Sequence, residues 1–123
     1  MLQGENVFSG SFNLVMAAKG EGVVGWCSCR IIGFEAELLK IAVREKWRRQ
    51  GVARHLLEGL WRQLANHEVE RIFLEVRAAN VPALSFYQKH GFLGTGIRSR
   101  YYQNPPDDAV LMEKTLLLKS KQG

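Results

Sequence analysis

The hydrophobic pattern of the chain changes its period at Gly51, and this change constrains the fold more than any other feature. Before Gly51, apolar residues partly alternate in short stretches separated by glycine-containing turns, which is typical of β-strands. After Gly51, apolar residues recur every three to four positions, as on one face of an amphipathic helix. This stripe consists of Val52, Leu56, Leu57, Leu60, Trp61 and Leu64. A chain that passes from strands to a helix in this way is expected to form a layered fold of sheet and helices.

The same patterns along the rest of the chain predict the remaining elements. Strands are predicted at 11–18, 23–32, 37–43, 71–76, 92–100 and 108–118, and helices at 52–67 and 80–90, with a loop at 103–107. Asn80 is a typical N-cap, Pro82 fits a first helical turn, and Gly91 is a natural stop. The nearly continuous apolar run at 71–76 predicts a central strand covered on both faces. The predicted fold class is a mixed α/β sheet, in a single domain over residues 1–123.

Charge and cysteine content narrow the class of protein only in part. The formal net charge is +5, from 17 Lys and Arg against 12 Asp and Glu, which indicates an anionic partner: nucleic acid, an anionic surface or a phosphorylated cofactor. Apolar runs are too short for a membrane span, and the first ten residues do not resemble a secretory signal. Cys27 and Cys29 give no disulfide framework, and no His cluster stands near them for a metal site. We expect ordinary strand cysteines, no metal and a cytoplasmic location.

A basic turn joins the third predicted strand to the first helix. It reads Arg48-Arg49-Gln50-Gly51-Val52-Ala53. The free N–H groups and partial positive charge of a helix N-terminus bind phosphate, and Gly51 lets the backbone approach an anion closely. The spacing fits neither a Walker loop nor a dinucleotide turn, because no Gly-Lys-Ser/Thr follows and Gly51 stands alone. From these residues alone, a solvated, capped turn is the other interpretation.

Two motif blocks together resemble the GNAT superfamily of acetyl-CoA-dependent N-acetyltransferases. The first is Arg48-x-x-Gly51-x-Ala53, which follows the strand 39–43 and resembles that family's pyrophosphate loop. The second resembles the other half of its cofactor site and reads Leu74-Glu75-Val76-Arg77-x-x-Asn80-x-x-Ala83-x-x-Phe86-Tyr87-x-x-x-Gly91-Phe92. The resemblance covers residues 38–92, in the family's order and separation. Residues 40–43, Arg98-x-x-Tyr101-Tyr102 and 108–112 also resemble bacterial members that acetylate the N-terminal alanine of a small-subunit ribosomal protein.

The resemblance implies a reaction in which an amine attacks the thioester of acetyl-CoA directly. It places the general base at Glu75, which interrupts an apolar strand. It places the general acid at Tyr87, with the hydroxyl near the CoA sulfur, and an ordinary tyrosine with a pKa near 10 stays protonated. The alternatives are an ion pair between Glu75 and Arg77 or another basic residue, and a packing role for Tyr87.

The resemblance also implies which residues bind the two substrates. Backbone groups of the third strand would bind the pantetheine amides, a bulge would splay this strand from its neighbour, and the first N–H groups of the helix would bind the pyrophosphate. The implied acetyl-CoA-binding residues are Ile41, Ala42, Val43, Arg48, Arg49, Gln50, Gly51, Val52, Ala53, Arg54, Asn80, Ala83, Tyr87 and Lys89. The candidate acceptor-binding residues are Glu35, Glu37, Tyr101 and Tyr102. Solvated surface is the alternative for each charged side chain.

The start of the sequence departs from the family pattern. Members of the family usually open with a strand and two helices before the hairpin, and those helices form one wall of the acceptor groove. This sequence starts almost at the hairpin. We therefore expect an N-terminally short domain or a partner that supplies the wall. An exposed edge strand would favour pairing with a second chain, as in a homodimer.

Three functions remain open from the sequence. The first is acetylation of a protein N-terminus. The second is acetylation of a small amine, such as a polyamine, amino acid or aminoglycoside, because a fold does not determine its substrate. The third is a non-catalytic CoA-binding module. A direct nucleic-acid function is not expected, because the basic residues concentrate where a cofactor phosphate would lie.

Overall fold

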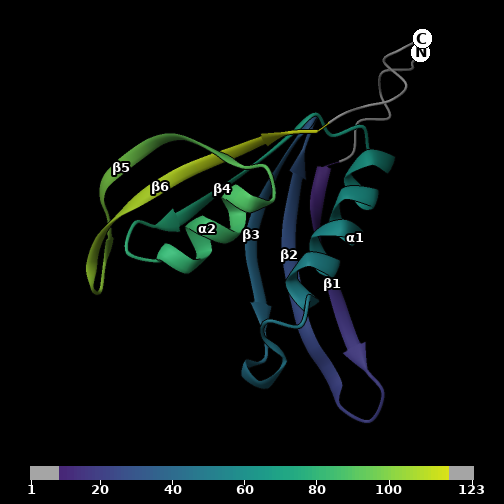
Figure 1. Cartoon of the computed structure of the whole chain (residues 1–123). Helices are drawn as coiled ribbons and strands as arrows, with labels where there is room; N and C mark the ends of the chain where they lie inside the picture. Colours follow the sequence, from purple (N-terminus) through teal and green to yellow (C-terminus); the bar gives the residue numbers. More distant parts are fainter. Residues whose placement is uncertain (1–8, 117–123) are drawn as a thin grey trace, which may run out of the picture.

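A six-stranded mixed sheet carries two α-helices on one face in the computed structural model, which describes residues 9–116 (Figure 1). The strand order is β1-β2-β3-β4-β6-β5, in which β3 and β4 run parallel and the other neighbours run antiparallel. The strands are β1 (Ser9–Ala18), β2 (Gly22–Ile32), β3 (Glu35–Val43), β4 (Arg71–Arg77), β5 (Leu93–Gln103) and β6 (Pro106–Thr115). The helices are α1 (Val52–Asn66), α2 (Val81–Lys89) and the short 3-10 helix η2 (Glu45–Trp47). The predicted mixed α/β architecture is confirmed.

The hairpin of β5 and β6 is tighter than the sequence predicted. A loop was expected over 103–107, but β5 continues to Gln103 and β6 begins at Pro106, and these two residues pair directly. A proline is tolerated at the first position of a strand, because it has no N–H to leave unpaired there. The Asn-Pro-Pro-Asp composition therefore indicates a turn but overstates its length. The last part of the strand predicted at 108–118 lies outside the described residues.

One hydrophobic core fills the space between the sheet and its helices. The predicted stripe of α1 faces the sheet, and Trp61 is its only half-buried member; the buried members are Val52, Leu56, Leu57, Leu60 and Leu64. Phe92, which follows α2, is buried and lies against the ring of Trp61 at a centroid distance of 6.2 Å. The two helices therefore share one core. No helix within residues 9–116 is long and apolar enough to cross a membrane.

Gly25 lets α1 approach the sheet closely. A Cβ atom at this position would lie 2.7 Å from Cγ1 of Val52 and 3.3 Å from Cδ1 of Leu56. Because β-branched Val52 cannot swing away easily, we expect Gly25→Ala to displace the first turn of α1. The expected loss in the free energy of unfolding is about 1–3 kcal/mol, measured by urea denaturation. Gly94→Ala is the control, since a Cβ there would meet nothing within 4 Å. Equal losses at the two glycines would contradict this account of Gly25.

The prediction that β4 is covered on both faces is wrong. Ile72, Leu74 and Val76 point into the core and are buried, but Phe73 and Glu75 on the other face are only half-buried. Within residues 9–116, no helix covers that second face (Figure 1). We call it the open face: the side of the sheet opposite α1 and α2, on which Phe73 and Glu75 lie. β4 is consistently apolar on one side only. Because Phe73 on the other side is also apolar, the sequence of this strand reads as a nearly continuous apolar run.

Candidate active site

β3 and β4 separate after a short stretch of parallel pairing. They pair only where Glu35, Ala36 and Glu37 lie opposite Arg71, Ile72 and Phe73. Just beyond, Leu39 is an extra residue in β3, because Leu38 lies opposite Cys29 while Lys40 lies opposite Ser28. A β-bulge of this kind bends its strand, and Figure 1 shows β3 and β4 diverging. The bulge that the family resemblance implied is confirmed.

Among the described residues, the separation leaves one edge of the second half of β3 without a strand partner. Ile41, Ala42 and Val43 still pair with β2 but not with β4. Their free backbone groups can therefore hydrogen-bond an extended ligand as if it were an added strand. This opening in the sheet fits the pantetheine arm of CoA, whose amides need such donors and acceptors. We refer to it as the β3–β4 opening.

The N-terminus of α1 lies beside the end of β3, since Gly25 pairs with Val43 and approaches Val52 closely. Gly51 is the N-cap, has a positive φ of 83°, and supplies no side chain to cap the helix. The first N–H groups of the helix, on Val52, Ala53 and Arg54, therefore lack intrahelical acceptors. Uncapped N–H groups and the helix dipole make this end suitable for a diphosphate.

The polar side chains around this helix end have differing roles. Arg48 donates from Nε to the Val43 carbonyl at 3.2 Å, and Gln50 donates to the Lys46 carbonyl at 3.0 Å, so both shape the loop. Arg54 forms an ion pair with Glu58 at 3.1 Å. Arg49 is exposed, with a positive φ of 64°. All of these side chains remain at the surface and keep the helix end basic.

α2 brings Tyr87 into the core side of the site. The side chain of Asn80 accepts a hydrogen bond from the Ala83 N–H at 3.2 Å, which confirms the predicted N-cap. Tyr87 is buried and packs edge-on against the rings of Phe86 and Phe92, at 5.4 Å in each case. Burial raises the pKa of Tyr87 to about 12, above the expected ordinary value. The hydroxyl is therefore held in the protonated form that a general acid needs. Lys89 is exposed at the end of the same helix.

Glu75 lies on the open face of β4, beyond the point where β3 and β4 separate. Its side chain is 21% exposed and forms an ion pair with Nε of Arg98 at 3.2 Å. A hydrogen bond to Glu75 raises the pKa of Tyr101. Arg77 turns away and donates to the Pro105 carbonyl at 2.8 Å. The ion pair considered for Glu75 thus exists with Arg98, and the role of Glu75 as base stays a prediction.

The four candidate acceptor-binding residues fall into two groups. Tyr101 and Tyr102 lie within β5, not after a strand as predicted, and their rings meet edge-on at 5.1 Å beside Glu75. The difference follows from the tight β5–β6 turn. Glu35 and Glu37 lie at the paired start of β3, where they form ion pairs with Arg71 and Arg30. The negative charges of Glu35 and Glu37 are thus already paired with arginines. Their role in binding an acceptor stays a prediction.

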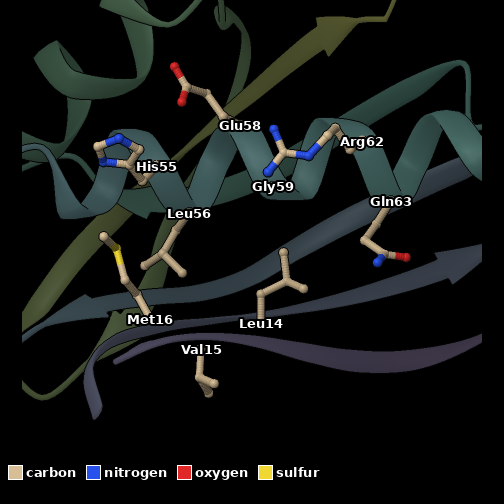
Figure 2. Close-up of a pocket in the computed structure, with 9 residues that line it drawn as sticks. All are labelled: Leu14, Val15, Met16, His55, Leu56, Glu58, Gly59, Arg62 and Gln63. Atoms are coloured by element: carbon tan, nitrogen blue, oxygen red, sulfur yellow. The ribbon is translucent and has the colours of Figure 1, made fainter. Parts of the chain in front are cut away.

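Arg98 forms an ion pair with Glu75 that the sequence did not indicate. Arg98 was visible in the Arg98-x-x-Tyr101-Tyr102 motif, and its long cationic side chain was the available signal. A metal site and a surface groove are the other features that could mark a functional site in this chain. Within residues 9–116, no three His, Cys, Asp or Glu side chains are placed to hold a metal. A groove of about 470 Å³ lies between β1 and α1, away from the β3–β4 opening (Figure 2).

An opening in a mixed sheet, a basic uncapped helix end and a protonated tyrosine together fit a CoA-dependent acyltransferase. The chain belongs to the GNAT acetyltransferase family: the family model described as "Acetyltransferase (GNAT) family" matches residues 4–92, more than half of the chain. GNAT acetyltransferases use acetyl-CoA as cosubstrate, and solved complexes with it share this fold. The chain is therefore an acetyl-CoA-dependent N-acetyltransferase.

Named N-acetyltransferases are similar to this chain in sequence and in structure. The ribosomal protein bS18-alanine N-acetyltransferase of Escherichia coli is 35% identical over 112 residues, which cover 89% of this chain and 72% of that protein. An N-alpha-acetyltransferase of Saccharolobus solfataricus is 37% identical over 83 residues, 67% of this chain and 49% of that protein. A crystal structure of the Escherichia coli ribosomal-protein-alanine enzyme superposes with a TM-score of 0.81 and 31% identity, over 93% of this chain and 74% of that one.

Proposed function

We propose that the acceptor is the N-terminal α-amine of a protein, and that an N-terminal alanine of a ribosomal protein is the preferred one. The observation that carries this proposal is the 35% identity over 72% of an enzyme whose name states that acceptor. The pair Tyr101 and Tyr102 on the open face supports it, because aromatic side chains beside the base suit a peptide chain. We take residues 1–123 to be one acetyltransferase domain that acts in the cytoplasm.

In the proposed reaction, Glu75 accepts a proton from the α-ammonium group, directly or through water. The freed lone pair attacks the thioester carbon, and the C–S bond breaks when the tetrahedral intermediate collapses. Tyr87 gives its proton to the leaving thiolate. The second proton that the nitrogen loses on forming the amide passes to solvent, and Tyr87 regains a proton from solvent. In this proposal Glu75 acts from the open face of β4, and Tyr87 acts from the helix face, on which it is buried.

Direct attack agrees with the state of the two cysteines. Cys27 and Cys29 are free and buried in β2, and burial raises the pKa of both thiols, that of Cys29 to about 12. A thiol must be ionised to act as a nucleophile. Neither cysteine is therefore suited to carry the acetyl group.

In the same proposal, the chain's backbone holds the acetyl donor. Ile41 and Val43 bind the pantetheine amides along the free edge of β3, and the N–H groups from Gly51 to Arg54 bind the pyrophosphate. Arg48, Arg49 and Lys89 add positive charge. Ala42, Gln50, Asn80 and Ala83 line the path of the donor.

An acceptor panel tests the proposal. The protein is incubated with acetyl-CoA and four acceptors: a ribosomal-type peptide with N-terminal alanine, the same peptide with a blocked N-terminus, a matched peptide starting with proline, and a mixture of small amines. We expect mass spectrometry to find one acetyl group on the free alanine peptide alone. Transfer only to the small amines would overturn the N-terminal proposal and keep the acetyltransferase.

We also propose a homodimer through the free edge of β1. Within residues 9–116, β1 ends the sheet and pairs with β2 alone, and Val15 on it is 64% exposed. An unpaired edge without charges or proline invites a further strand. A groove between β1 and α1 lies beside this edge, and Leu14 and Met16 point into it while Val15 points away from α1 (Figure 2). Its lining residues are Leu14, Val15, Met16, His55, Leu56, Glu58, Gly59, Arg62 and Gln63. Light scattering after gel filtration would show twice the chain mass, and Val15→Lys would shift it to the monomer.

A further inference from the structure

The carboxylate of Glu75 is contacted by an arginine from a strand that is not its neighbour. β6 lies between β4 and β5 in the sheet. Glu75 is opposite Leu111 of β6, and Arg98 of β5 is opposite Ala109. The long side chain of Arg98 must therefore cross β6 on the open face to bring its Nε to 3.2 Å from Oε2 of Glu75.

Tyr101 completes the contact. Its ring lies 5.5 Å from the guanidinium carbon of Arg98, and Glu75 raises the pKa of its hydroxyl. Arg98 thus contacts both the carboxylate of Glu75 and the ring of Tyr101. This arrangement depends on an irregular stretch of β5, because the register between Arg98 and Tyr102 is shifted and Arg100 has a positive φ of 53°. The irregular stretch turns both Arg98 and Tyr101 toward β4.

We infer that Arg98 is a positioning residue that holds the carboxylate of Glu75 in place for proton abstraction. This inference rests on the proposed role of Glu75 as base. Arg98 gives and takes no proton: the proton moves from the substrate ammonium to Glu75 alone. A charge-assisted contact fixes a carboxylate better than water does, and an ionised carboxylate is the form that can accept a proton.

The same arrangement acts on the incoming amine. The guanidinium places a positive charge next to the position where the ammonium group meets Glu75. Two positive charges close together disfavour each other, so Arg98 favours the neutral amine once the proton has moved. Other charged or titratable groups also face this cluster: Tyr102 of β5 lies in the field of Glu75, and Glu37 of β3 acts on Tyr101.

A double-mutant cycle tests whether Arg98 acts through Glu75. We expect Arg98→Met to lower kcat about tenfold, with the KM for acetyl-CoA unchanged, because the base is misplaced rather than removed. In a Glu75→Gln background, the same Arg98→Met change should alter kcat by less than about twofold, since its target is gone. Arg98→Lys keeps the charge and should restore part of the rate. An equal tenfold loss in both backgrounds would assign Arg98 a purely structural role and overturn the inference.

Arg62→Met is the matched control for this cycle. Arg62 is an exposed arginine of α1 in the groove beside β1, away from β5. The Arg62→Met substitution removes the same charge and changes the side-chain volume as much as Arg98→Met does. We expect it to leave kcat unchanged. The cycle is measured with whichever amine of the acceptor panel receives the acetyl group. Failure of the peptide proposal therefore does not prevent the cycle from deciding the role of Arg98.

A second measurement needs no acceptor. The chain has 3 tyrosines, so the ring-carbon NMR signal of Tyr101 can be assigned and titrated. The pKa of Tyr101 is raised, first by its hydrogen bond to Glu75 and then by the charge of Glu75, while Arg98 lowers it. Glu75→Gln should therefore lower the pKa of Tyr101, and Arg98→Met should raise it further. A Tyr101 titration that neither variant moves would show that the cluster does not form.

Discussion

Glu75→Gln is expected to lower kcat by about 10²–10⁴-fold, because a positioned general base contributes a factor of this size. Glutamine has nearly the same shape, so the ion-pair partner and the sheet stay in place, but it cannot accept the proton. Acetyl-CoA binding, measured by calorimetry, should stay within about twofold, since Glu75 lies on the open face and not among the backbone groups proposed to bind the donor. A variant with wild-type kcat would remove Glu75 from the mechanism.

Tyr87→Phe tests the general acid in the same assay. We expect a loss of about 10²-fold in kcat with little change in stability, because the phenyl ring keeps the contacts with Phe86 and Phe92. The pKa of Tyr87 is raised from the ordinary 10 to about 12, so the fold favours the neutral hydroxyl. The stabilisation that comes from keeping this hydroxyl neutral is fully present below pH 10 and is lost as the pH rises through about 12. The wild-type pH–rate profile should therefore show no loss from Tyr87 below about pH 10.

Leu60→Ala is expected to have the largest effect on stability. Leu60 is fully buried at the centre of the α1 stripe, in the core shared with β2 and α2. Removing its side chain should lower the free energy of unfolding by about 2–5 kcal/mol, as the lost transfer term and the remaining cavity add. Urea denaturation monitored by circular dichroism measures this loss. Leu93→Ala is the control, because Leu93 is 72% exposed and should change stability by less than about 0.5 kcal/mol.

The outcome of Leu60→Ala also bears on function. α1 carries the uncapped N-terminus proposed to bind the pyrophosphate, and Leu56 and Leu57 anchor its first turns in the same core. We expect the Leu60→Ala protein to bind acetyl-CoA weakly at high temperatures, where it is partly unfolded. Binding should recover when the protein is cooled to a temperature at which it is folded. A stable Leu60→Ala protein would show that α1 does not depend on this core contact.

Local signals in the sequence predicted the elements that carry the site. The stripe after Gly51, the Asn80 cap and the Gly91 stop are each properties of neighbouring residues, so no knowledge of the fold was needed to place α1 and α2. The open face was not predictable in this way. Phe73 extended the apolar run of β4, and only the absence of a covering helix within residues 9–116 shows that its second face is partly exposed.

The contact between Glu75 and Arg98 depends on long-range features. The two residues lie in β4 and β5, which are separated by β6, and the register of β5 is irregular between Arg98 and Tyr102. Strand order and register shifts of this kind arise from the whole sheet, not from the local sequence. The motif indicated that Arg98 and the tyrosines belong together, but their meeting at Glu75 required the structure.

The most direct test of the account is the transfer of an isotopically labelled acetyl group from acetyl-CoA, followed by mass spectrometry of both the protein and an alanine-starting peptide. The account predicts one labelled acetyl group on the α-amine of the peptide, and none on the protein whether or not the peptide is present. Label on Cys27 or Cys29 would contradict direct attack. Absence of label from every amine offered, with acetyl-CoA bound, would contradict the assignment of Glu75 and Tyr87 as an active base and acid.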